Sequence, residues 1–349
     1  MPSSFGEDAQ GELYALSMDG AAYRFTETAA LPMERPFPTL LSQTGLFRDT
    51  ASLETAPGVV EYVLNADAWT DGAEARHWMA LPARTKIGFH PDRAWDFPKG
   101  TAFAQHLEML TTEGRWRLET RVLLHEISGW AGYTYKWNKA QSDAELLTSV
   151  EEETLSIPHY VWSSKARNHL YPGTNDCQRC HNPAAGPVLG VQARQLNRVA
   201  PFPDGLENQL ERWDRAGFFD QPIGTRENLT SLVDPRDKDR ELGLRVRSYL
   251  DVNCSHCHRP DGPAMLGLDM RFATPLDQTN LVGTRPVHGS EKERAKFFII
   301  APGDRHASAL YHRMRWKNAR RMPPVSAGVT DPLNDTLIGD WIESLRASR

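Results

Sequence analysis

A five-residue motif that occurs twice places the strongest constraint on this chain. Cys177-Gln-Arg-Cys180-His181 and Cys254-Ser-His-Cys257-His258 share the spacing Cys-x-x-Cys-His, and together they contain all four cysteines of the 349 residues. Two cysteines about one helical turn apart match the separation of the two vinyl groups of a porphyrin, and the following histidine is placed to bind the iron. The spacing therefore predicts two covalently attached c-type haems and leaves no cysteine for a disulfide.

Other uses of paired cysteines fit these residues less well. Two Cys-x-x-Cys pairs supply enough ligands for a structural zinc site, but the pairs lie 77 residues apart and zinc requires no histidine after each pair. A thioredoxin-like dithiol needs a βαβ setting, which the sequence does not show. The predicted proximal iron ligands are therefore His181 and His258, and the predicted attachment points are Cys177, Cys180, Cys254 and Cys257.

A second axial ligand is predicted for the haem of the second motif. Met322 lies 64 residues after His258, directly before two prolines and a last helix-like run. The prolines argue against an ordinary helical core position, and a thioether would complete His/Met coordination, which raises the haem potential. Met314 is the competing candidate, with core packing as its expected role. His256, inside the second motif, is expected at the surface.

The haem of the first motif has no comparable downstream ligand. Between His181 and the second motif the chain contains no histidine and no methionine. The distal ligand is therefore expected upstream or from the other haem-binding domain, or it is missing, which would leave a five-coordinate iron able to react. His106 and Met109 are the first candidates because they lie in a strand-like run. The other upstream candidates are Met79, His90, His125, His159 and His169.

Short runs of β-branched and aromatic residues fill the first half of the chain. Between residues 44 and 160 they are separated by Gly, Pro, Asp and Asn, at the spacing of an all-β sandwich. The predicted strands are 59–64, 76–81, 101–110, 116–124 and 132–137. Residues 11–25 alternate apolar and polar side chains around Asp19-Gly20, which predicts a hairpin, and the proline-rich segment 27–42 predicts a linker.

After Pro158 the expected structure is helical. Residues 206–219 and 242–250 carry apolar side chains at helical spacing, and Asp331-Pro332 supplies an N-cap and a first-turn proline for a last helix. The predicted fold class is α+β multidomain, a β-sandwich-like N-terminal module followed by mainly α haem-binding modules. The predicted boundaries are 1–43 for the hairpin and linker, 44–160 for the β-rich module, 161–233 for the first haem-binding module and 234–349 for the C-terminal domain.

Composition and charge argue against several classes of protein. The net charge of −5, without a basic stripe, argues against nucleic acid as a partner. No apolar run approaches the roughly 18 residues of a transmembrane helix. Haem attachment outside the cytoplasm predicts a periplasmic protein, yet the first residues lack the charged and apolar regions of an export signal. We therefore expect a processed or truncated form.

The chain resembles a family of bacterial dihaem c-type cytochromes in which a β-rich region precedes two Cys-x-x-Cys-His motifs. The segments that carry this resemblance are 65–74, 118–123, 132–138, 183–190, 194–197 and 321–324. It implies mainly α cytochrome c modules around the motifs. Members are often fused behind a β-propeller similar to quinoprotein sugar dehydrogenases, and residues 11–25 look like the last strands of such a propeller.

Electron transfer is the function that these residues favour. Two haems and no recognisable substrate site predict a periplasmic protein that passes electrons from a dehydrogenase to a respiratory acceptor. The alternative is a dihaem redox enzyme, peroxidase-like or oxidase-like, with catalysis at the first haem. A third interpretation, carbohydrate or partner binding by the tryptophan-rich β module, is weaker because aromatic residues in strands usually belong to the core.

Overall fold

The computed structural model describes residues 2–17, 20–25, 37–158, 166–264, 267–324 and 328–345. The chain forms two compact units, Met1–Pro38 and Thr39–Arg349. The first unit contains a three-stranded antiparallel sheet made of β1 (Pro2–Glu7), β2 (Leu13–Ser17) and β3 (Ala22–Arg24). The pairing of β2 with β3 confirms the predicted hairpin, and β1 adds a strand that the sequence did not predict. Met18 and Asp19 of the predicted turn lie outside the described residues.

A six-stranded antiparallel sheet dominates the second unit. Its strands are β6 (Val59–Tyr62), β7 (Glu74–Ala80), β8 (Ala102–Thr111), β9 (Gly114–Glu126), β10 (Gly129–Trp137) and β11 (Ala144–Leu146). They follow one another across the sheet in the order β11-β10-β9-β8-β7-β6. Each connection joins two strands that are neighbours in the sheet. Successive side chains of a strand point to opposite faces, so every second residue of a strand shares a face.

The two faces of this sheet pack against different parts of the chain. On one face Met79 and Phe103 belong to a core cluster with Trp213 of α3 (Gln209–Arg215). On the other face Trp78 packs in a separate cluster with Phe47 of β4 (Phe47–Asp49). Both faces are therefore buried, one of them largely by helix and loop.

The remaining elements of this unit are short. The small strands are β5 (Glu54–Thr55), β12 (Glu151–Ser156), β13 (Ala166–Tyr171), β14 (Val199–Phe202) and β15 (Gly205–Asn208). The other helices are α1 (Thr174–Cys180), α2 (Ala193–Leu196), α4 (Leu242–Asn253), α5 (Glu291–Lys296), α6 (Ala309–Arg313) and α7 (Asp340–Ser344). Single 3-10 turns lie at η1 (Leu41–Thr44), η2 (Arg226–Asn228), η3 (Leu276–Gln278) and η4 (Arg305–Ala307), and the π-helical η5 (Asn334–Gly339) precedes α7.

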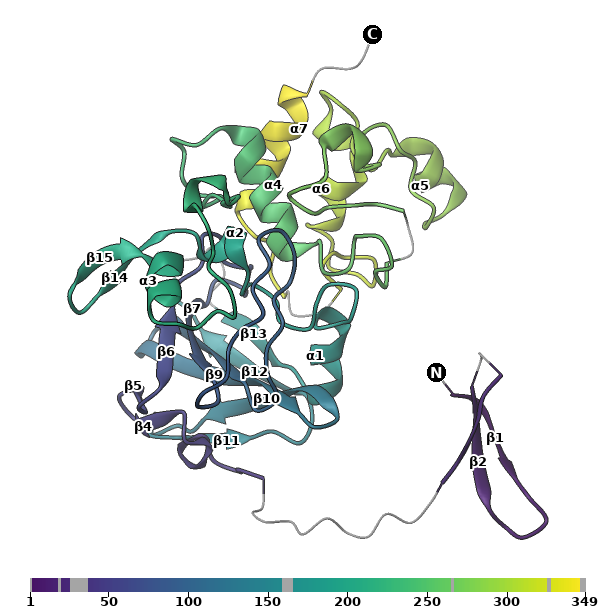
Figure 1. Cartoon of the computed structure of the whole chain (residues 1–349). Coiled ribbons are helices and arrows are strands. Elements are labelled where there is room, and N and C mark those ends of the chain that lie inside the picture. Colours follow the sequence, from purple (N-terminus) through teal and green to yellow (C-terminus); the bar gives the residue numbers. More distant parts are fainter. Residues whose placement is uncertain are drawn as a thin grey trace. The chain divides into compact units, whose positions relative to one another are not determined.

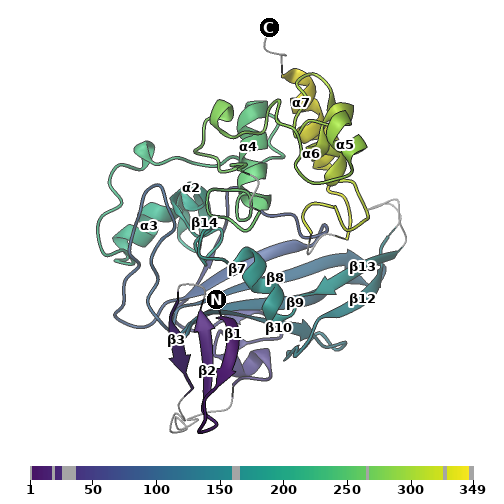
Figure 2. The same ribbon diagram turned by 90° about the vertical axis from the view of Figure 1, so that its right-hand side faces the viewer.

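Within this unit the sheet and the C-terminal helices form separate layers. Figure 1 shows α4 and α7 next to each other, and Figure 2 shows α4, α6 and α7 on one side of the strands β7 to β10. The helices enclose their own core, which includes Val246, Leu310, Leu337 and Ile342. No helix among the described residues is long and apolar enough to cross a membrane.

The predicted fold class is wrong in two respects. The β-rich region is not a sandwich, because every other sheet among the described residues has only two or three strands. The region around the motifs is not mainly α, because the chain is β-rich, with 30% of residues in strands and 20% in helices, and no cytochrome-like all-α module is evident in its described part. Proline accounts for much of the second error: residues 183–235 contain six prolines, which interrupt helices.

Candidate functional site

The first motif begins in helix α1 and ends in a tight turn. His181 follows the last residue of α1, and its backbone N–H donates a 2.9 Å hydrogen bond to the carbonyl of Cys177. The helix lies against β10 at Gly132, where an added Cβ would come within 2.6 Å of the Cys177 Sγ. A glycine is therefore needed at this point of the sheet for α1 to approach it.

The His181 ring is oriented by its own loop. Its Nδ1 lies 2.7 Å from the carbonyl oxygen of Pro187, which can only accept a hydrogen bond, so Nδ1 carries the proton and donates. Burial lowers the pKa of His181, which favours the neutral ring. The Nε2 atom then keeps its lone pair, which is the form that binds a metal ion.

The second motif directly follows α4 and has one backbone hydrogen bond in common with the first motif. The Glu241 carboxylate caps α4 by accepting hydrogen bonds from Gly243 and Leu244, and the helix ends at Asn253. The N–H of His258 donates a 2.9 Å bond to the carbonyl of Cys254, the same i to i−4 bond as in the first motif. The two motifs therefore share this backbone hydrogen bond, although Cys177 lies within α1 and Cys254 lies directly after α4.

The surroundings of His258 leave one ring nitrogen without a partner. Its Nδ1 is buried and has no hydrogen-bond partner among the described residues. Burial, and then the nearby Arg313 charge, lower the pKa of His258. Just after the motif, a Cβ on Gly262 would lie 2.4 Å from the backbone oxygen of Cys257, so this loop also requires glycine.

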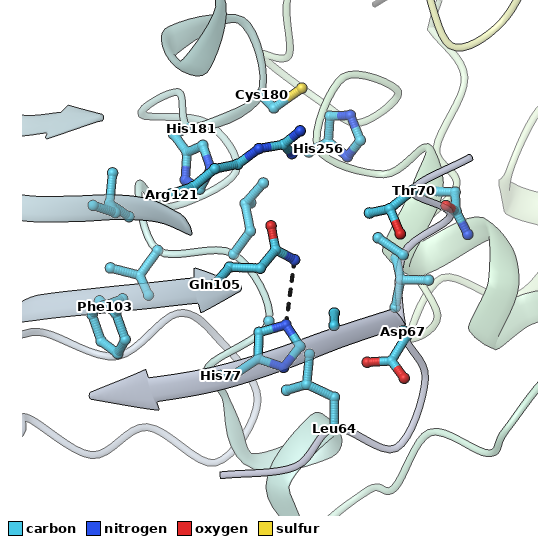
Figure 3. Close-up of a pocket in the computed structure, with 18 of the residues that line it drawn as sticks. Leu64, Asp67, Thr70, His77, Phe103, Gln105, Arg121, Cys180, His181 and His256 are labelled. Carbon is cyan, nitrogen blue, oxygen red and sulfur yellow. Dashed lines mark hydrogen bonds between the residues drawn. The ribbon is translucent and has the colours of Figure 1, made fainter. Parts of the chain in front are cut away.

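A cavity of about 290 Å³ opens beside the first motif and is lined by Cys177, Cys180 and His181. Strands β7, β8 and β9 place a row of polar side chains on its wall. His77 pairs with Gln105, and Gln105 with Arg121, in the register of the sheet, so the three side chains share one face. Figure 3 shows this row, in which His77 Nε2 lies 3.3 Å from Gln105 Nε2.

A buried ion pair fixes the end of this row. Arg121 Nη2 lies 2.6 Å from Glu119 Oε1, and His169 Nε2 lies 2.9 Å from the same oxygen. Burial opposes the charge of Glu119, but Arg121 and His169 outweigh it and hold the pKa of Glu119 below its ordinary value. Arg194 and Arg259 also line the cavity, so three guanidinium groups surround it.

The upstream ligand candidates are dispersed in the fold. His106 lies on the sheet face opposite to Gln105, fully buried, with its Nδ1 3.0 Å from Thr120 Oγ1. Met109 packs in a separate core cluster. Neither lines the cavity, and of the other five candidates only His169 does so among the described residues. His159 lies outside the described residues. The roles of His106 and Met109 as distal ligands stay predictions.

The sequence interpretation missed His77, although it considered Met79 on the same strand. The two residues are separated by one position, so they point to the same face of β7. His77 is buried, and burial lowers its pKa to about 4, so the ring is neutral at physiological pH. The two-residue period of the strand was the signal that could have found it.

His256 differs from its expected position. It is only partly exposed and lines the cavity of the first motif, together with Arg259. Figure 3 shows His256 across the cavity from His181, with the Arg121 side chain between them. The expectation of a surface histidine is therefore wrong, because the second motif packs against the first.

Met322 lies in the loop between α6 and η5. Its backbone N–H donates a 2.9 Å hydrogen bond to the carbonyl of Arg313, the residue whose charge also acts on His258. Its side chain lines a cavity of about 30 Å³ together with Met314 and Tyr249. His258 does not line that cavity, so coordination by Met322 stays a prediction.

Comparison with known protein families, curated proteins and solved structures found no match to this chain in any of the three. The described residues also contain no cluster of three or more His, Cys, Asp or Glu side chains that could hold a metal ion. The assignment to a family of bacterial dihaem cytochromes, with a propeller remnant at the N-terminus, is therefore not supported, and we correct it.

The residues around the first motif fit a covalently attached porphyrin. The cavity reaches both thiols, the absent side chain of Gly132 leaves room for Cys177, and the bond from His181 Nδ1 leaves the Nε2 lone pair for iron. Two axial ligands suffice for haem iron because the porphyrin supplies the other four, so a cluster of three protein ligands is not required. Arginines on the wall could pair with the carboxylates of the porphyrin.

Proposed function

We propose that this chain carries two c-type haems, attached at Cys177/Cys180 and Cys254/Cys257, and that it transfers electrons. The observation that supports this most is the hydrogen bond common to both motifs, in which the N–H of each histidine donates a 2.9 Å bond to the carbonyl of the first cysteine of its motif. Haem bound in this way is a one-electron carrier. His181 and His258 would be the proximal ligands, with Met322 as the distal ligand of the second iron.

The surroundings of the motifs support electron transfer through their burial. Burial raises the pKa of Cys180 to about 11 and that of Cys254 to about 12, so both thiols are largely withdrawn from water. Withdrawal from water reduces the solvent reorganisation that accompanies a change of charge. The proposed partners are a dehydrogenase as donor and a respiratory acceptor, and the proposed location is the periplasm.

Covalent haem content tests this proposal directly. The chain is produced in the periplasm of a host with a cytochrome c maturation system, and the intact mass and the pyridine haemochrome spectrum are measured. We expect a mass increase of two haems that survives acidic acetone extraction. The variants Cys177→Ser/Cys180→Ser and Cys254→Ser/Cys257→Ser should each keep one haem. A wild-type chain without bound haem would refute the proposal.

A second candidate function is reduction of a peroxide at the first motif. The polar row of His77, Gln105 and Arg121 in the cavity favours it, because such groups can move protons and stabilise developing charge. Reduction of one hydrogen peroxide to two waters takes two electrons and two protons, and the electrons would arrive through the second haem. Peroxide consumption by the reduced protein, lost on Arg121→Ala and kept on exposed Arg84→Ala, would favour this candidate over simple electron transfer.

A further inference from the structure

The two motifs touch each other although they lie 77 residues apart in the sequence. The side-chain amide of Asn182 donates a 2.9 Å hydrogen bond to the backbone carbonyl of His256. The Cys257 Sγ lies 3.7 Å from the backbone carbonyl oxygen of Arg179. Arg179 and Asn182 lie immediately before and after the last two residues of the first motif. The contacts therefore lie on either side of Cys180 and His181, two of the three residues that would hold the first haem.

Local packing fixes this contact from both sides. The Asn182 Oδ1 accepts a 3.0 Å bond from the N–H of Ala185, which holds the side chain in the orientation that reaches His256. The second motif is confined by its own loop at Gly262, where no Cβ would fit against the Cys257 carbonyl. Neither motif can withdraw from the other without losing these contacts.

The second motif also supplies part of the first motif's cavity. His256 and Arg259 both line it, as does Ser255. The surroundings of the first site are therefore incomplete without the second motif.

We propose that this contact holds the two motifs together so that they act as a pair, with an electron passing inside the protein from one attachment site to the other. This inference rests on the proposed function, since it needs haem at both motifs. The Arg179 carbonyl belongs to the peptide bond that precedes Cys180, and the Sγ of Cys257, which would carry the other porphyrin, lies 3.7 Å from its oxygen. The bound haems would supply both the electron donor and the electron acceptor, so no further reactant would be required.

Electron paramagnetic resonance of the full-length, two-haem protein tests the pairing. Two ferric irons held close together broaden each other's signals, so we expect the fully oxidised spectrum to differ from the sum of the two single-haem variants. Because those variants can fail to mature, the wild-type protein is also measured during a redox titration. We expect the remaining ferric signal to sharpen as the first electron enters. Signals that are additive and independent of reduction would overturn the pairing.

A variant at the contact separates this inference from the proposed function. Asn182→Asp keeps the oxygen that accepts from Ala185 but removes the donor to the His256 carbonyl. We expect weaker broadening while both haems stay attached, whereas Asn138→Asp in the β10–β11 turn should behave as wild type. Unchanged broadening in Asn182→Asp would contradict the role of this contact. Absence of haem from the wild-type chain would instead refute the proposed function.

Discussion

Gly132 of β10 lies directly against Cys177 of α1, so close that a Cβ on Gly132 would be 2.6 Å from the Cys177 Sγ and 2.7 Å from its Cβ. The variant Gly132→Ala must therefore push α1 away from the sheet, at a cost of about 1–3 kcal/mol. We expect less haem on the first motif and unchanged haem on the second, measured by mass spectrometry of peptides from each motif.

The matched control for this variant is Gly6→Ala in β1. Gly6 also lies in a strand, but no atom lies within 4 Å of a Cβ built on it. Equal haem occupancy of the first motif in Gly132→Ala and Gly6→Ala would show that the close approach to Cys177 has no role in attachment.

Asp71 ties the loop before β7 to the segment that follows Met322. Its carboxylate accepts hydrogen bonds of 2.8 Å from the N–H of Gly328 and 3.0 Å from that of Val329, and the residue is buried. Asp71→Asn replaces one acceptor oxygen with an amide NH2 group, which then faces a backbone N–H. We therefore expect a loss of about 1–3 kcal/mol in the free energy of unfolding. Denaturant unfolding measures this loss, and exposed Asp277→Asn should leave the midpoint unchanged.

Met322 and Met314 have different predicted roles, which two parallel substitutions separate. If Met322 is the distal ligand, Met322→Ala removes the charge-transfer band of methionine-ligated ferric haem and lowers the potential of that haem. Met314 is a partly buried residue packed against the C-terminal core, so Met314→Ala should reduce stability by about 2 kcal/mol but keep the band. Retention of the band in Met322→Ala would exclude this ligand.

His106 makes the fold sensitive to acid. Burial lowers its pKa to about 3 from the ordinary value of 6.5, so below pH 6.5 the unfolded chain takes up a proton that the folded chain refuses. The contribution of His106 to the free energy of unfolding is therefore complete above pH 6.5 and is lost as the pH falls toward 3. At pH 5 the loss is about 2 kcal/mol.

His106→Gln removes this proton uptake, so we expect its unfolding free energy to fall less than that of the wild type between pH 7 and pH 5. Urea unfolding at the two pH values gives the comparison. His77 and His256 remain in both proteins, and burial lowers the pKa of each to about 4, so their contribution cancels. Parallel decreases in the two proteins would contradict a neutral, buried His106.

Elements with a local pattern were predicted closely. The expected strands 59–64, 76–81 and 101–110 correspond to β6, β7 and β8, and the helix expected before the second motif corresponds to α4. The capping role of Asp331 is also present, since its Oδ1 accepts from the N–H of Leu333, although the first part of that helix is π-helical. Alternation, helical period and capping can be predicted because neighbours in sequence decide them.

The sandwich prediction failed for a different reason. Buried residues on both sides of β7, such as Trp78 and Met79, indicate that both faces of a sheet are covered. They do not indicate what covers them. Here Trp213 of a helix covers one face, and Phe47 of a short strand covers the other. Contacts between distant segments depend on the summed packing of the chain, which no local pattern records.

By itself the sequence determined the two Cys-x-x-Cys-His motifs and predicted haem attachment at them, because a five-residue spacing is a local property. Tertiary structure alone decided that His77, Gln105 and Arg121 form one row, since strand register joins positions that are far apart in the chain. It also decided that the motifs meet at Asn182 and His256, because this contact joins segments 77 residues apart and depends on how the rest of the unit packs.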